Sequence, residues 1–158
     1  MALHFSKQEF EKRKLATLKS MKEQNLDALL MFRQESMFWL TGYDTFGYVF
    51  FQTLILDHKG NIILLTRAPD LRQAQNTSNI EDIRIWVDKD QSNPTDDLKI
   101  ILNELNLKGK KIGIEYEAYG MTGRNALRLN KSLEGYCEVE DQSELITKHR
   151  VVKSQEEI

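Results

Sequence analysis

The side chains that could carry out catalysis or hold a metal are few and lie far apart along the chain. The three histidines, His4, His58 and His149, share no H-E-x-x-H motif, and no paired-cysteine spacing accompanies them. The single cysteine, Cys137, lies in a segment with strand character, which favours a packed side chain over a nucleophile. No serine occupies a G-x-S-x-G elbow, and no glycine spacing matches a phosphate-binding loop. We therefore predict no catalytic residue and no metal ligand set in this chain.

One segment is unusual because it concentrates aromatic residues. Residues 37–52 hold seven of the fourteen aromatic side chains. For three of these side chains the sequence favours core packing: Phe38, Trp39 and Phe51. Four other side chains share a polar loop bracketed by two glycines, where core packing and a binding or interface role fit equally well: Tyr43, Asp44, Phe46 and Tyr48.

The composition is that of an ordinary globular domain. The chain has 158 residues, 41% hydrophobic and 29% charged, with a net charge of −2. This balance provides no basic surface for nucleic acid and no polybasic membrane anchor, so we expect neither partner. One cysteine excludes an intrachain disulfide, and the first residues have no secretory pattern. We therefore expect a cytoplasmic protein.

Strands and helices alternate in the pattern of hydrophobic residues, especially in the second half of the chain. Period-2 or short apolar runs predict strands over residues 27–32, 49–56, 61–65, 82–87, 111–115 and 136–139. Helical spacing and capping residues predict helices over residues 6–24, 35–40, 68–76, 94–105, 122–133 and 144–149. Right-handed crossovers would make most strand pairs parallel, and the hairpin at residues 49–65 adds an antiparallel pair. The predicted fold class is α/β, a three-layer α/β/α sandwich around a mixed, roughly six-stranded sheet.

The last residues carry a signal for the start of a helix. Ser154 and Glu157 have the spacing of a capping box, in which each side chain can bond the other residue's amide. We expect residues 1–150 to form one domain and residues 151–158 to begin a helix of a longer protein, of which this chain is the front part. We also expect this last turn to be frayed or held by foreign contacts, because the surface it would pack against is missing.

Several of these segments, taken in order, resemble a known family. Glu35-Ser-Met-Phe-Trp-Leu-Thr-Gly-Tyr-Asp44 is similar to the "E-N-x-x-Y-L-T-G-Y/F" element of the creatinase/prolidase N-terminal domain. Lys111-Ile-Gly-Ile-Glu115 resembles its "I-G-x-E" strand, and residues 150–158 resemble its closing "R-x-V-K-S-x-x-E-I". Weaker matches are the opening helix with Lys12-Arg13, the first strand at residues 26–30, and the strand-end arginine in Leu64-Leu-Thr-Arg67.

The resemblance implies a fold with a ribonuclease H-like motif and a non-catalytic role within a larger enzyme. It also implies that residues 151–158 begin the linker helix into a catalytic domain that lies beyond Ile158. The parent would be an Xaa-Pro dipeptidase or aminopeptidase whose second, pita-bread domain binds two divalent metals, manganese, cobalt or zinc. In such proteins the first domain supports a homodimer and restricts the active site to short proline-containing peptides. The implied substrate-access or interface residues are Tyr43, Asp44, Phe46, Tyr48, Phe50 and Arg67.

Two other functions stay open at this point. Catalytically inactive relatives would use the domain as a peptide-binding or dimerisation module. A creatinase-like hydrolase would act on small C–N compounds, although Phe50 stands near the position where creatinase has an arginine. Arg67 and Asp70 also allow two explanations, a place in the substrate cleft or a strand-end ion pair or helix cap, and the second is favoured.

Overall fold

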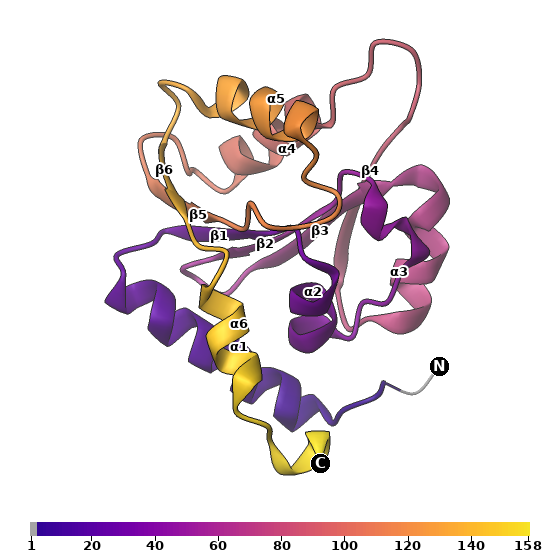
Figure 1. Ribbon diagram of the computed structural model, residues 1–158, viewed down its shortest axis with the longest axis vertical. Coiled ribbons are helices and arrows are strands. Elements are labelled where there is room, and N and C mark those ends of the chain that lie inside the picture. Colours follow the sequence, from indigo (N-terminus) through magenta and orange to yellow (C-terminus); the bar gives the residue numbers. More distant parts are fainter. Residues whose placement is uncertain (1–2) are drawn as a thin grey trace.

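A single six-stranded mixed sheet forms the centre of the molecule. The computed structural model describes residues 3–158 (Figure 1). The sheet order is β4-β3-β2-β1-β5-β6, and β2 is the only strand antiparallel to its two neighbours. The strands are β1 (Ala28–Met31), β2 (Thr53–Asp57), β3 (Ile62–Arg67), β4 (Asp82–Trp86), β5 (Lys111–Ile114) and β6 (Glu138–Asp141).

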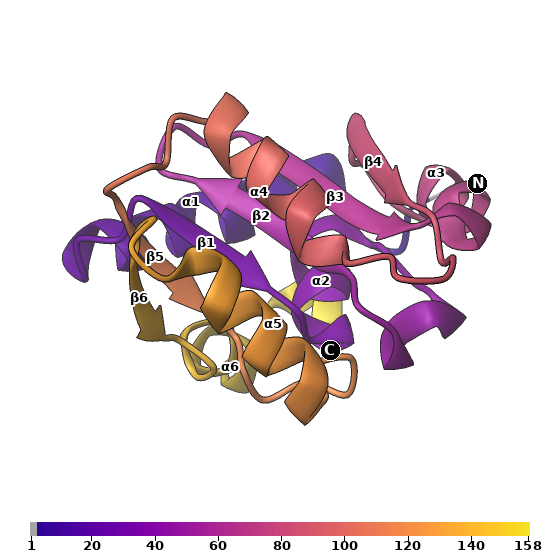
Figure 2. The same cartoon turned by 90° about the horizontal axis from the view of Figure 1, so that it is seen from above.

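Helices cover both faces of this sheet. Figures 1 and 2 show α4 (Pro94–Glu104) and α5 (Gly123–Leu133) side by side on one face. The other face carries α1 (Lys7–Glu23), α2 (Gln34–Thr41), α3 (Leu71–Thr77) and α6 (Leu145–Val151). Three short 3-10 helices are η1 (Phe46–Val49), η2 (Ala68–Asp70) and η3 (Gln155–Glu157). The predicted three-layer α/β/α fold is confirmed.

The core follows directly from the alternation of side chains along each strand. Along β1, Ala28 and Leu30 face the α4–α5 layer, whereas Leu29 and Met31 face the layer of α1 and α2. All four side chains are fully buried, as expected for a central strand covered on both faces. The continuous apolar run that predicted this strand therefore reflects two separate cores.

The predicted strand at residues 49–56 is wrong in its first half. Residues 46–49 form η1 instead, because the Thr45 side chain accepts a hydrogen bond from the Gly47 amide at 2.8 Å and caps a helical turn. Strand β2 begins only at Thr53.

Strand β4 is buried differently from what its sequence pattern predicts. The alternation of Ile83, Ile85 and Val87 with polar residues and Trp86 predicts that the three aliphatic side chains share the buried face. Ile83 does pack against the core, but Ile85 and Val87 are exposed and Trp86 is buried. The Trp86 indole donates a hydrogen bond to the Phe51 carbonyl at 2.9 Å, which fixes this face of the edge strand inward.

The last turn is ordered rather than frayed. Glu156 and Glu157 of η3 contact α1, as described below. Within residues 3–158, no helix is long and apolar enough to cross a membrane.

Candidate functional site

Several loops meet at one edge of the sheet because five strands run in the same direction. Strands β1, β3, β4, β5 and β6 are mutually parallel through their pairings, so their carboxyl ends lie on the same edge. The chain leaves β1 toward α2 on one face and leaves β5 toward α5 on the other. Ligands of open α/β sheets commonly bind at such a switch point. A pocket of about 430 Å³ lies there, lined by Arg33, Glu35, Tyr116, Glu117, Ala118 and Tyr119.

Four large aromatic side chains are exposed at this edge. Phe46 is 87% exposed, Tyr48 39%, Phe50 41% and Tyr119 75%, and we call these four residues the aromatic surface. Tyr48 and Tyr119 pack edge to face, with ring centroids 5.7 Å apart. Exposed aromatic clusters of this kind are typical of contact surfaces.

The two loops that carry the aromatic surface are locked together at the backbone. A Cβ atom at Gly120 would lie 2.3 Å from the Phe50 carbonyl oxygen and 3.2 Å from that of Tyr48. Only glycine permits this approach, so the loop after β5 packs backbone against backbone on residues 48–50.

Arg67 connects the aromatic surface to the end of β3. Its guanidinium lies 3.4 Å from the centre of the Phe50 ring, and its Nε donates to Asp70 Oδ2 at 3.1 Å. Asp70 is buried, and a Cβ at Gly47 would lie 2.5 Å from its carboxylate. The strand-end ion pair is therefore present, and it orients Phe50 as well.

Tyr43 and Asp44 differ from the other predicted residues. The Tyr43 side chain is completely buried, and its hydroxyl bonds Gln52 at 3.0 Å and Thr66 at 3.2 Å. Because this side chain is buried, Tyr43 belongs to the core and not to an accessible surface. The same burial raises the pKa of its phenol. Asp44 is exposed, but its amide donates to the Thr77 hydroxyl at 3.1 Å, which ties the loop to α3.

Glu115 and Tyr119 have roles at this edge that the sequence analysis missed. The buried Glu115 carboxylate accepts hydrogen bonds from the Phe32 and Arg33 amides, both at 3.0 Å, and from the Ser36 hydroxyl at 2.6 Å. It holds the two residues that precede α2 and the Ser36 side chain in the first turn of that helix, although burial raises its pKa to about 7. Glu115 is the last residue of the predicted strand at residues 111–115, and Tyr119 lies four residues further along, so their position at the carboxyl edge was the available signal.

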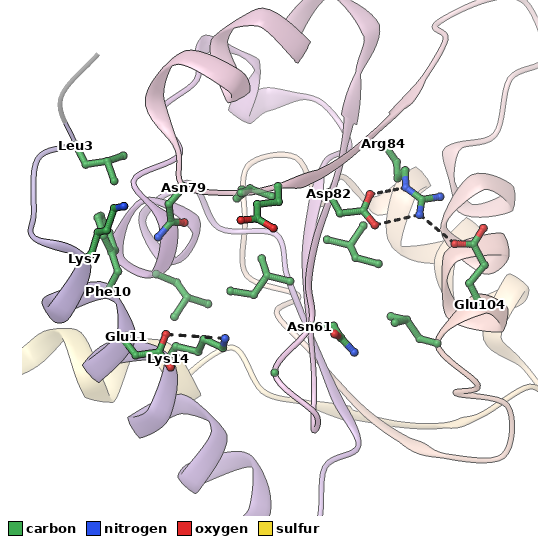
Figure 3. Close-up of a pocket in the computed structure, with 17 residues that line it drawn as sticks. Leu3, Lys7, Phe10, Glu11, Lys14, Asn61, Asn79, Asp82, Arg84 and Glu104 are labelled. Atoms are coloured by element: carbon green, nitrogen blue, oxygen red, sulfur yellow. Dashed lines mark hydrogen bonds and ion pairs between the residues drawn. The ribbon is translucent and has the colours of Figure 1, made fainter.

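A second, larger pocket lies elsewhere and carries charges of both signs. It encloses about 990 Å³ between α1, the amino ends of β3 and β4, and the end of α4 (Figure 3). Arg84 pairs there with Asp82 at 2.5 Å and with Glu104 at 3.2 Å. None of the predicted site residues lines either pocket.

The described residues that line the two pockets include no histidine and no cysteine. Across residues 3–158, no group of three or more His, Cys, Asp or Glu side chains is placed to hold a metal ion. The thiol of Cys137 is half-buried, and burial raises its pKa, which opposes formation of the thiolate. What the carboxyl edge offers chemically is apolar contact and cation–π stacking.

The fold and this edge define a three-layer α/β domain whose carboxyl edge carries a cluster of exposed aromatic side chains. The chain belongs to the creatinase/prolidase N-terminal domain family, whose profile matches residues 13–152. The recognition from sequence motifs is thereby confirmed.

Solved structures and a curated relative agree with this assignment. A dipeptidase from Pyrococcus horikoshii OT3 superposes with a TM-score of 0.73 at 23% identity, over 91% of this chain and 38% of that one. A proline dipeptidase from Streptococcus pneumoniae gives a TM-score of 0.71 at 18% identity, over 89% of this chain and 98% of that one. An uncharacterized hydrolase/peptidase, y4tM, from Sinorhizobium fredii is 28% identical over 163 residues. The chain spans 41% of that relative's length.

Proposed function

We propose that this chain is the non-catalytic N-terminal domain of a cytoplasmic, metal-dependent Xaa-Pro peptidase. The observation that carries the proposal is the family match over residues 13–152, together with the partial coverage of the hydrolase/peptidase relative. The structural neighbours include proteins described as a dipeptidase and a proline dipeptidase. The reaction would take place in a following domain that binds two divalent metals, manganese, cobalt or zinc.

Within such an enzyme the domain would support a homodimer and restrict access to the active site. The aromatic surface supports this role, because aromatic side chains are enriched in the energetically dominant parts of interfaces. Phe46 and Tyr119 would contact the catalytic domain or the partner subunit and leave room only for short proline-containing peptides.

Comparing this chain with the longer protein tests the proposal. Xaa-Pro dipeptides are incubated with each protein in the presence of manganese, cobalt or zinc, and released proline is measured. We expect turnover by the longer protein and none by residues 1–158 alone. Metal-dependent turnover by the 158-residue chain would contradict a non-catalytic role. A longer protein that binds proline peptides without cleaving them would identify a binding module instead.

A further inference from the structure

The cap of α1 is completed by a side chain from the other end of the chain. Ser6 and Glu9 have capping-box spacing, but only the Ser6 hydroxyl takes part as expected, accepting from the Glu9 amide at 3.1 Å. Glu9 instead accepts from Arg13 Nε at 3.0 Å. Glu156 accepts the hydrogen bond that Glu9 would accept in a capping box. The Ser6 amide donates to Glu156 Oε2 at 2.8 Å, and the Ser6 hydroxyl donates to Glu156 Oε1 at 2.6 Å.

A buried arginine makes a second connection to the same turn. Arg13 is 2% exposed, and its Nη1 donates to the Trp39 carbonyl at 2.7 Å. Its Nη2 lies 3.5 Å from Glu157 Oε1, and Glu157 also accepts from the Ser154 amide at 2.9 Å. A buried guanidinium needs charge partners, so Glu157 and Glu9 together compensate it. One side chain thus joins α1, α2 and η3.

The apolar side chains on either side of this turn are turned to solvent. Val151, Val152 and Ile158 are all more than two-thirds exposed, at 72%, 78% and 88%. Figure 1 shows the C-terminal turn beside the beginning of α1. The carboxylates of Glu156 and Glu157 therefore bind this domain, whereas the neighbouring apolar side chains are left exposed.

We propose that Glu156 and Glu157 form a clasp with Ser6 and Arg13 that fixes the direction in which the chain leaves the domain. The clasp holds the following domain in one orientation relative to α1. This second part rests on the proposed function, which places a catalytic domain after residue 158. The clasp itself depends only on contacts within residues 3–158.

Amide hydrogen exchange of the 158-residue chain tests the clasp. The variant combines Glu156→Ala with Glu157→Gln, and Gln155→Ala, an exposed residue of the same turn, is the matched control. We expect exchange at the Ser6 amide to accelerate about fivefold or more, the factor of a typical helix cap, with no change in the middle of α1. Unchanged exchange at Ser6, or equal acceleration in the control, would overturn the clasp.

Small-angle scattering of the longer protein tests the orientation. We expect the clasp variant to broaden the distribution of interatomic distances, and the Gln155→Ala control to match the unaltered protein. Lost protection at Ser6 with unchanged scattering would refute the role in domain orientation. An unaltered longer protein without peptidase turnover would refute the proposed function alone, because neither exchange nor scattering depends on catalysis.

Discussion

Glu115 is a titratable group in a position where its charge is costly, and stability should depend on pH through it. The carboxyl group is fully buried, and desolvation outweighs the hydrogen bonds from Ser36, Arg33 and Phe32, so its pKa rises from 4.5 to about 7. The folded chain therefore holds this proton more tightly than the unfolded chain does. The contribution of Glu115 to stability is complete below pH 4.5, declines as the pH rises toward 7, and is lost above it. The difference amounts to about 3 kcal/mol.

Glu115→Gln tests this dependence. Glutamine keeps one oxygen for the Phe32 and Arg33 amides and can donate to the Ser36 hydroxyl, so these three hydrogen bonds survive without the titration. We expect the variant to gain stability over the natural chain between pH 5 and 8, measured by urea denaturation at each pH. The matched control is Glu117→Gln, whose side chain is 77% exposed. Parallel pH profiles for the natural chain and Glu115→Gln would show that the buried carboxyl does not titrate in this range.

At the scale of elements, a helix or strand was predicted correctly where local sequence decides the structure, and less well where tertiary contacts decide it. Helices α4 and α5 were predicted well because Asn93 and Thr122 are N-caps and act within one turn. The first half of the strand predicted over residues 49–56 was wrong: its β-branched and aromatic residues indicate a strand, but Thr45 caps η1 and Asp70, from a later element, packs against Gly47. The contact between Gly47 and Asp70 joins two segments that are distant in the sequence, and hydrophobic periodicity does not register it.

The contact between the two loops of the carboxyl edge can be broken by one methyl group. In Gly120→Ala the new Cβ would meet a backbone carbonyl that cannot rotate away, so both loops must shift. We expect a loss of about 2 kcal/mol in the free energy of unfolding, measured by urea denaturation. Gly123→Ala is the matched control, because nothing lies within 4 Å of its added Cβ, and it should be neutral or slightly stabilising. Equal effects of the two substitutions would contradict the locked arrangement.

At the scale of the whole molecule, the sequence predicted the three layers correctly, but it did not determine which side chains of the aromatic segment are accessible. Phe46, Tyr48 and Phe50 are exposed, and their role in substrate access or in an interface stays a prediction. Tyr43 could not be distinguished from them, because its burial depends on hydrogen bonds between its hydroxyl and the side chains of Gln52 and Thr66. Tyr119 was missed because it joins the aromatic surface only when β1 and β5 pair in parallel.

In the longer protein, the aromatic surface should favour short peptides over longer ones as substrates, because we expect it to narrow the approach to the catalytic domain. Replacing Phe46 and Tyr119, its two most exposed members, by serine removes two rings without disturbing the buried Tyr43 or the Arg67–Asp70 pair. We expect kcat/KM for an Xaa-Pro tetrapeptide to rise by roughly tenfold relative to that for a dipeptide, about 1.4 kcal/mol of discrimination. The matched control replaces Leu127 and Ile100, exposed apolar residues on the α4–α5 layer, by serine and should leave the ratio unchanged. If the ratio of kcat/KM for the tetrapeptide to that for the dipeptide does not change in the Phe46 and Tyr119 variant, and dimerisation is intact, the aromatic surface has no role in substrate selection.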